Sequence, residues 1–241
     1  MCEYVHLPFQ SGDDDVLKEM KRGYTAERYL GIINDIKEMI PDVSLTTDII
    51  VGFPGETEEQ FQNTLRLYEE VEFDNAFTAA YSPRPNTPAA EREDQVADLI
   101  KADRLNRLNE MVRYYAGKRS ERFMGRELEV LVEGPNPEDP EGGCVGKTRT
   151  NRLIFFPGRY EELKRKTIVA RVTETRAVRE TDGGLGTLIA RLPELDVFVL
   201  RCTSGDAVSR AHVPCVEIPY HASIACTMLT RRRPICSGSS R

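Results

Sequence analysis

Three short segments of the 241-residue chain carry residues that could bind a polar ligand. They are residues 6–12, 52–57 and 81–87, and each follows or ends a short β-branched or aromatic run. Amide, hydroxyl and guanidinium side chains, together with the backbone of rigid turns, offer hydrogen bonds to a nucleoside, a carboxylate or a phosphate. The segments form one site if the fold brings them to one edge.

The turn Gly52-Phe53-Pro54-Gly55-Glu56 has a backbone suited to a flat ligand. Gly52 directly after an apolar run lets such a ligand approach the main chain. Pro54 fixes one φ angle and Gly55 permits a positive one, so the turn is rigid. Its N–H and C=O groups can then pair with the edge of a purine. A purely structural strand-to-helix turn explains the pentapeptide equally well.

Three polar side chains beside the turns are further candidates. Gln10 and Ser11 offer an amide and a hydroxyl to a ribose or an amino-acid carboxylate, but they also suit a helix cap before residues 13–15. Arg84 stands between two prolines, so its guanidinium is positioned in advance for a carboxylate or phosphate. Taken alone, all three fit a structural or surface role better.

Two ionisable side chains lie inside predicted strands. Asp48 is costly to bury without a partner, so it either faces a polar barrel interior or is paired, and we favour the interior. His6 we expect to be a hydrogen-bonded core histidine.

The periodicity of residues 1–123 predicts strands that alternate with helices. We expect strands over 4–9, 44–51 and 75–81, and helices over 14–22, 25–40, 57–71 and 93–123. Thr57 with Gln60 forms a capping box. Strand–helix–strand repeats predict a parallel sheet with right-handed crossovers, in which ligands bind at the carboxyl ends of the strands.

The pattern changes near Gly125. Strands predicted over 127–133, 152–156 and 167–175 indicate a small all-β module, a sandwich or a barrel. Residues 1–116 hold 12 Lys and Arg against 23 Asp and Glu, whereas residues 117–181 hold 14 against 11. The basic second module could meet a polyanion, although solvated surface charge is the plainer explanation. Residues 181–241 lack sustained periodicity, and we expect a poorly ordered tail.

A basic cluster in the second module precedes two aromatic residues. Lys147, Arg149 and Arg152 lie on and beside a predicted hairpin, and Phe155 and Phe156 follow. Strand alternation buries one phenylalanine and exposes the other, which could stack on an RNA base. In the alternative, both phenylalanines are core and the cations are solvated.

Several classes of protein are excluded by what the sequence lacks. No segment approaches the ~18 apolar residues of a spanning helix, and no signal peptide is visible, so we expect no membrane partner. Six cysteines without C-x-x-C spacing and three histidines predict no metal site held by this chain. The same cysteines favour a reducing compartment.

Several ordered motifs resemble the tRNA methylthiotransferases, a family of radical-SAM enzymes. They are CEYVHLPFQSG, VLKEMKRGYT, TDIIVGFPGET and YSPRPNTPAA. The closest branch is the MiaB type, which thiomethylates isopentenyladenosine beside the anticodon; Gln10-Ser11 and Arg84 distinguish it from the sibling branch that modifies a ribosomal protein. Asn86 departs from the family's usual glycine, but Asn tolerates the left-handed conformation. Residues 117–180, with GKTRTNRLIFF, resemble the RNA-binding TRAM module.

The resemblance implies a domain organisation and a ligand. Residues 1–116 would be the last three βα units of the radical-SAM barrel, with the final helix reaching about 123. Residues 117–180 would be a TRAM β-barrel and 181–241 an unmatched tail. The implied S-adenosylmethionine site comprises Gln10, Ser11, Asp48, Gly52, Phe53, Pro54, Gly55, Glu56, Tyr81 and Arg84. The implied RNA partner is the tRNA anticodon stem-loop.

The cysteines that hold the family's two [4Fe–4S] clusters are absent from this sequence. Cys2 belongs to the ordinary C-E dipeptide of the first motif and is no cluster ligand by position. We therefore expect the carboxyl-terminal part of the enzyme, inactive as this chain alone and without assigned catalytic residues. A non-catalytic RNA-binding protein with a vestigial half-barrel is the alternative; an unrelated metabolic enzyme would need the motifs to coincide by chance. The expected location is the cytoplasm or an organelle of bacterial ancestry.

Overall fold

The computed structural model describes residues 2–176 and 187–192, which lie within one compact unit, Cys2–Arg201. Most of the expected tail, 181–241, lies outside the described residues. No helix in the described part is both long and apolar enough to cross a membrane.

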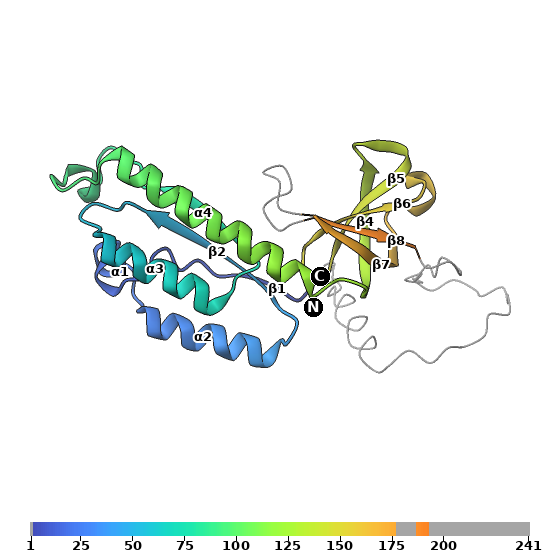
Figure 1. Cartoon of the computed structure of the whole chain (residues 1–241), viewed down its shortest axis with the longest axis horizontal. Coiled ribbons are helices and arrows are strands. Elements are labelled where there is room, and N and C mark those ends of the chain that lie inside the picture. Colours follow the sequence, from blue (N-terminus) through green and yellow to red (C-terminus); the bar gives the residue numbers. More distant parts are fainter. Residues whose placement is uncertain (1, 177–186, 193–241) are drawn as a thin grey trace, which may run out of the picture. The chain divides into compact units, whose positions relative to one another are not determined.

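The first part is a three-stranded parallel sheet with helices between its strands (Figure 1). The strands are β1 (Tyr4–His6), β2 (Ser44–Val51) and β3 (Asn75–Ala80), in the order β1-β2-β3. The helices are α1 (Asp14–Glu19), α2 (Ala26–Met39), α3 (Glu58–Val71) and α4 (Asp98–Glu121), with a 3-10 turn, η1, at Pro88–Glu91. The predicted alternation and parallel pairing are confirmed, and β2 has the predicted bounds.

Helix boundaries follow local capping chemistry. Thr57 and Gln60 form both halves of the capping box of α3: Gln60 N donates to Thr57 Oγ1 at 3.3 Å and Thr57 N donates to Gln60 Oε1 at 2.9 Å. Helix α4 begins five residues later than predicted, after a loop in which Arg92 and Asp94 form an ion pair at 2.6 Å and Ala97 is extended.

One face of the sheet forms the core with the helices. Leu45, Ile49 and Val51 of β2 are buried in one cluster with residues of α2, α3 and α4. Alternate residues point the other way, and there Phe77 of β3 is 52% exposed. The second face is therefore open in the described structure, as expected of part of a barrel.

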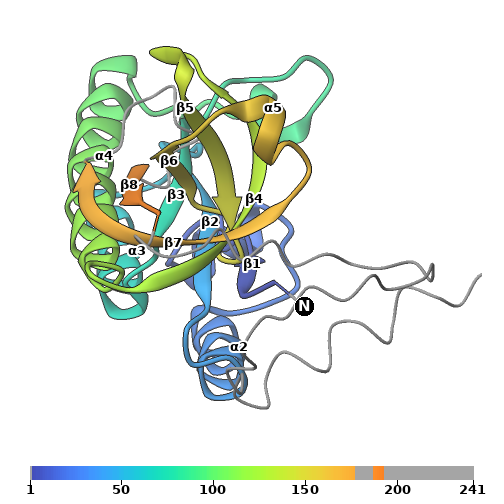
Figure 2. The ribbon, with the colours of Figure 1, turned by 90° about the vertical axis from the view of Figure 1, so that its right-hand side faces the viewer.

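The second part is a closed five-stranded barrel (Figure 2). Its strands are β4 (Glu127–Asn136), β5 (Asp139–Thr148), β6 (Leu153–Pro157), β7 (Thr167–Arg176) and β8 (Thr187–Arg191), with the one-turn helix α5 (Tyr160–Leu163) after β6. They close in the order β4-β5-β6-β8-β7. Of the two predicted architectures, the barrel is found.

Two strands of the barrel, β5 and β8, were not predicted from the sequence. The sequence of β5, DPEGGCVGKT, is rich in glycine and contains a proline, which are weak strand formers. Strand β8 pairs with β6 and β7, so the tail begins later than the expected boundary at residue 180. That boundary is corrected, because Leu188 and Ala190 fill the barrel core.

Candidate functional site

The three predicted ligand segments meet at the carboxyl edge of the sheet. Gln10 extends the pairing beyond β1: its N donates to Asp48 O, and Ile50 N donates to Gln10 O, both at 2.9 Å. Tyr81 N donates to Val51 O at 2.8 Å, and the Tyr81 and Phe53 rings lie edge to face with centroids 5.2 Å apart. The fold thus brings the segments together as the sequence predicted.

The two glycines of the turn after β2 are required by its backbone. Gly52 has φ +71° and Gly55 has φ +80°, a region that favours glycine. A Cβ atom on Gly52 would lie 2.5 Å from Lys101 Cγ, and one on Gly55 would lie 2.6 Å from Asp94 Oδ2. The chain itself fills the space beside both glycines, so the predicted approach of a flat ligand to Gly52 is wrong on that side.

Two backbone donors of the same turn are also in use. Gly52 N donates to Glu56 Oε2 at 2.6 Å, and Gly55 N donates to Asp94 O at 2.9 Å. These N–H groups therefore cannot pair with a purine edge. Phe53 and Pro54, both buried, retain their positions at the carboxyl edge.

Glu56 locks the turn by a buried ion pair. Its Oε2 lies 2.8 Å from Arg104 Nη1 on α4, and the two side chains are 1% and 5% exposed. Burial raises the pKa of the Glu56 carboxyl, while the bonds from Gly52 N and Arg104 oppose that rise. Arg104 was not predicted. The signal lay in its spacing, since Arg104 falls four residues before Leu108 on the buried face of α4.

Gln10 and Ser11 are buried residues of the folded structure. Gln10 has φ +66° and is 7% exposed, whereas Ser11 is 1% exposed. The Ser11 hydroxyl lies 3.3 Å from Thr64 Oγ1 and accepts from Asp13 N at 3.3 Å. The cap of α1 is instead Asp13, so neither predicted residue caps that helix.

The open face of the sheet carries a polar and aromatic group. His6 Nε2 lies 3.3 Å from Asp48 Oδ1, with both side chains partly exposed, and His6 Nδ1 lies 3.0 Å from Thr46 Oγ1. The rings of His6 and Phe77 meet edge to face at 5.7 Å. Asp48 thus both faces the open side and has a partner. The expectation that His6 is a core residue is wrong, because the face on which it lies is uncovered.

Tyr81 provides an unsatisfied polar atom at this edge. Within the described structure its buried Oη has no hydrogen-bond partner, and neither has Glu56 Oε1. The Lys101 ammonium lies 5.9 Å from the centre of the Tyr81 ring. Arg84 is exposed in the loop after β3, where Asn86 takes the expected left-handed conformation at φ +65°. Buried polar atoms without partners suit a site that a polar ligand completes.

The two cysteines of the described residues do not fit an iron–sulfur cluster. Cys2 is exposed and Cys144 lies in the barrel core. In residues 2–176 and 187–192, no three His, Cys, Asp or Glu side chains are grouped to hold a metal ion.

The predicted RNA cluster is divided by the fold. Arg152 is fully buried: its Nη2 donates to Asp74 Oδ1 at 2.5 Å and its Nη1 donates to Ser120 Oγ at 2.8 Å. Arg149 donates to both carboxylate oxygens of Glu3, and these hydrogen bonds raise the pKa of the Arg149 guanidinium. The assignment of Arg152 to RNA is wrong and that of Arg149 is weakened, because acidic residues of the first part hold them. Lys147 remains exposed on β5.

The two phenylalanines behave as strand alternation predicts. Phe156 is 3% exposed in the barrel core, whereas Phe155 is half-buried and points outward. The alternative that placed both in the core is wrong.

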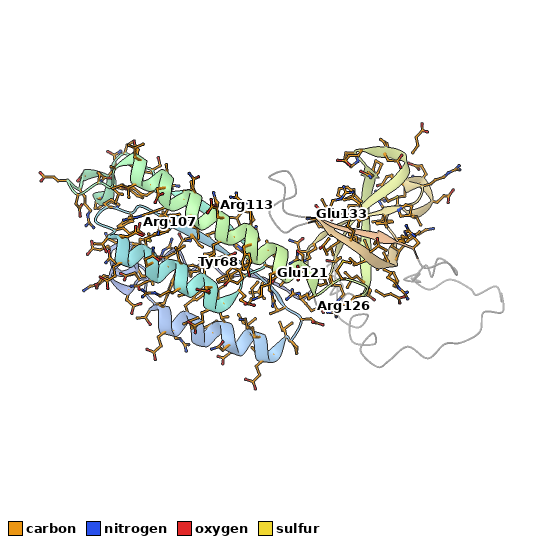
Figure 3. The ribbon with its side chains drawn as sticks, viewed as in Figure 1. Tyr68, Arg107, Arg113, Glu121, Arg126 and Glu133 are labelled. Atoms are coloured by element: carbon orange, nitrogen blue, oxygen red, sulfur yellow. The ribbon has the colours of Figure 1, made fainter. Side chains whose placement is uncertain are left out.

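Asp74 is the centre of a charged cluster that sequence reasoning missed. Besides Arg152, it accepts from Arg122 Nη2 at 2.9 Å, Arg119 Nη2 at 3.5 Å and Leu45 N at 2.9 Å. At the surface nearby, Arg126, labelled in Figure 3, pairs with Asp42 at 2.9 Å. Much of the basic excess of the second part therefore neutralises acids of the first.

Two domain families match parts of this chain. Residues 1–68 match the Radical SAM superfamily, and residues 121–178 match the TRAM domain. Together these matches support a family that joins a radical SAM domain to a TRAM domain. The solved coproporphyrinogen III oxidase from Escherichia coli, described as a radical SAM enzyme, is 15% identical, with a TM-score of 0.41 over 71% of this chain and 41% of that one. The present chain thus spans about two fifths of that structure's length.

Proposed function

From the premise of a radical SAM domain joined to a TRAM domain, we propose that this chain is part of a tRNA methylthiotransferase of the MiaB type. The reaction adds a 2-methylthio group to N6-isopentenyladenosine next to the anticodon. The observation that carries the proposal is the meeting of three motif-bearing segments at one sheet edge, in a chain that continues into a closed barrel. The ordered motifs of those segments narrow the family to this branch.

S-adenosylmethionine would lie against the carboxyl edge of β2 and β3. Tyr81 Oη, buried without a partner in the described structure, would hydrogen bond to it, and the partly exposed Asp48 lies on the open face beside the edge. The exposed Arg84 guanidinium would hold its carboxylate. When bound and reduced by a cluster, this cofactor supplies the radical chemistry of the superfamily. Glu56 and Arg104 act at a distance, by fixing the turn that shapes the edge.

The proposal requires cluster ligands other than the described residues. No described residue set fits a cluster, so no reaction step is assigned to this chain. The proposed tRNA partner and a cytoplasmic or organellar location follow from the same family assignment.

A non-catalytic RNA-binding protein is the second candidate. It is favoured by the occupied donors of Gly52 and Gly55, which leave fewer groups for a ligand. The candidates differ in whether the chain binds S-adenosylmethionine.

Isothermal titration with S-adenosylmethionine separates the two candidates. The enzyme proposal expects binding that weakens in Tyr81→Phe and not in Tyr114→Phe, a matched change at an exposed tyrosine. Sequencing the transcript upstream gives an independent test. An in-frame C-x-x-x-C-x-x-C triplet supports the enzyme, whereas tRNA binding without cofactor binding or such a triplet supports the second candidate.

A further inference from the structure

The barrel has the strand arrangement of an oligonucleotide-binding fold. Numbered from β4, its five strands close in the order 1-2-3-5-4. The third and fifth strands, β6 and β8, are parallel, the other pairs are antiparallel, and α5 follows the third strand. In such folds, oligonucleotides bind across strands 2 and 3, beside the loop that joins strands 1 and 2. Here those strands are β5 and β6, and the loop is the β4–β5 hairpin tip.

A hollow of about 520 Å³ lies beside that tip, over β6 and the neighbouring strand β8. Its apolar wall is formed by outward-facing residues of β6 and β8, namely Leu153, Phe155 and Ile189. Phe155 and Ile189 are direct neighbours in the register of the two strands. The hairpin tip contributes Asn136 and Asp139 to the lining. This volume is in the range of small-molecule sites.

The hairpin tip holds its shape through its own polar side chains. Asn136 Oδ1 accepts from Glu138 N at 3.0 Å, and Asp139 Oδ1 accepts from Gly142 N at 3.1 Å. A Cβ atom on Gly143 would lie 2.9 Å from Asn136 Cβ, so the glycine lets the tip lie close to β5. This part of the lining is therefore held in shape by the chain itself.

The charges around the hollow suit a neutral aromatic ligand beside a phosphate. Glu138 and Asp139 line the hollow and disfavour an anion beside them, and Arg176, which also lines it, is paired with Glu174 at 3.2 Å. Lys147 is exposed on β5 and lies directly opposite Leu153 in the β5–β6 register, so a cation stands beside the apolar wall. A flat neutral group on Phe155 with its anionic backbone near Lys147 is what a single-stranded nucleotide presents.

We propose that this hollow binds one unpaired nucleobase of an RNA strand, stacked on Phe155, with the adjoining phosphate at Lys147. The proposal rests on the proposed function insofar as that function makes RNA the partner. It replaces the basic cluster expected from the sequence, because Arg149 and Arg152 are committed to Glu3 and Asp74.

The full chain allows a direct test, because it contains no tryptophan. Phe155→Trp places a single fluorophore in the hollow. Met39→Trp is the matched control, since Met39 is a 72%-exposed residue on α2, outside the barrel. The probe is decauridylate, unlabelled for tryptophan quenching and fluorescein-labelled for anisotropy. We expect quenching of F155W, with a midpoint equal to that of the anisotropy titration, and little quenching of M39W.

Two further variants test the contacts without a new fluorophore. Phe155→Leu keeps apolar area but removes the aromatic face, and it should weaken decauridylate binding on the order of tenfold. Lys147→Ala should lower the slope of log K against log salt concentration by about 0.7, the value for one phosphate of a single strand. Met39→Ala, a change at an exposed residue of α2, should change neither quantity.

The outcomes distinguish this site from RNA binding in general. Two results would overturn the hollow as the base site and leave the RNA partner standing. In the first, decauridylate binds and quenches M39W as strongly as F155W. In the second, F155L binds decauridylate as tightly as the wild type. Absence of any anisotropy change with both decauridylate and labelled tRNA overturns the RNA role itself, and the present proposal with it.

Discussion

The substitution Asp74→Asn tests whether the buried charged cluster couples the two parts of the chain. Asp74 and Arg152 are both fully buried, and Arg119 and Arg122 also direct their guanidinium groups to Asp74. Asparagine keeps the shape but removes the negative charge that Arg119, Arg122 and Arg152 share in the described structure. Breaking a buried ion pair costs about 3–5 kcal/mol.

Urea unfolding followed by circular dichroism measures this cost. For an m value of about 2–3 kcal/mol/M, we expect the unfolding midpoint of D74N to fall by about 1–2 M. The matched control is Asp42→Asn, which breaks the ion pair with Arg126, whose two side chains are 60% and 44% exposed. Exposed pairs contribute at most about 1 kcal/mol, so the midpoint of D42N should stay close to wild type.

A double variant separates the lost charge from the lost packing. Arg119 and Arg122 are 22% and 20% exposed and can turn toward water, but Arg152 cannot. Changing Asp74 to Leu together with Arg152 to Met should therefore recover much of the stability lost in D74N. Equal midpoints for D74N and D42N would refute the idea that the buried pair couples the parts.

Three further predictions follow. Gly52→Ala should lower the free energy of unfolding by about 1–3 kcal/mol, because the positive φ of Gly52 and the side chain of Lys101 both oppose a Cβ atom. The measurement is the urea midpoint, compared with that of Gly117→Ala, where a Cβ atom would meet no other atom. Equal losses in the two variants would contradict this reasoning. The hydrogen bond from Arg149 holds the pKa of Glu3 below its ordinary value of 4.5, so the ionised Glu3 stabilises the fold above that pH. The difference in unfolding free energy between wild type and E3Q should therefore shrink as the pH falls below 4.5. A difference that grows on acidification would speak against the pair. Anaerobic reconstitution of the full chain should yield far fewer than the four irons of a cluster, and close to four per chain would refute the absence of a cluster site.

The parts of this fold that could be predicted are those determined by residues close together in the sequence. Strand β2 has the predicted bounds because its eight residues form a continuous β-branched and apolar run. The capping box at Thr57 was predictable because its partners are three residues apart. The carboxyl-edge site followed from strand and helix alternation, since parallel strands end at the same edge.

The errors arise where the deciding partner is distant in the sequence. The sequence predicted Arg152 to belong to a basic surface cluster, but its partner Asp74 lies 78 residues earlier in the chain. The sequence predicted Glu56 to be a turn residue that faces a ligand. Instead, Arg104 on helix α4, 48 residues later, donates a hydrogen bond to its carboxylate. Strand β5 was missed because its pairing with β4 and β6 outweighs a glycine-rich sequence.

The pairing of the barrel's cations has a consequence for how quickly RNA can be found. Arg171 pairs with Glu127, Lys164 with Glu161 and Arg176 with Glu174, besides the arginines held by the first part. A surface neutralised in this way attracts a polyanion weakly at long range. We expect the encounter rate to stay near ~10⁵–10⁶ M⁻¹s⁻¹, the range for proteins without electrostatic guidance. Residence time, set by short-range stacking, would then govern how long an RNA strand stays on this molecule.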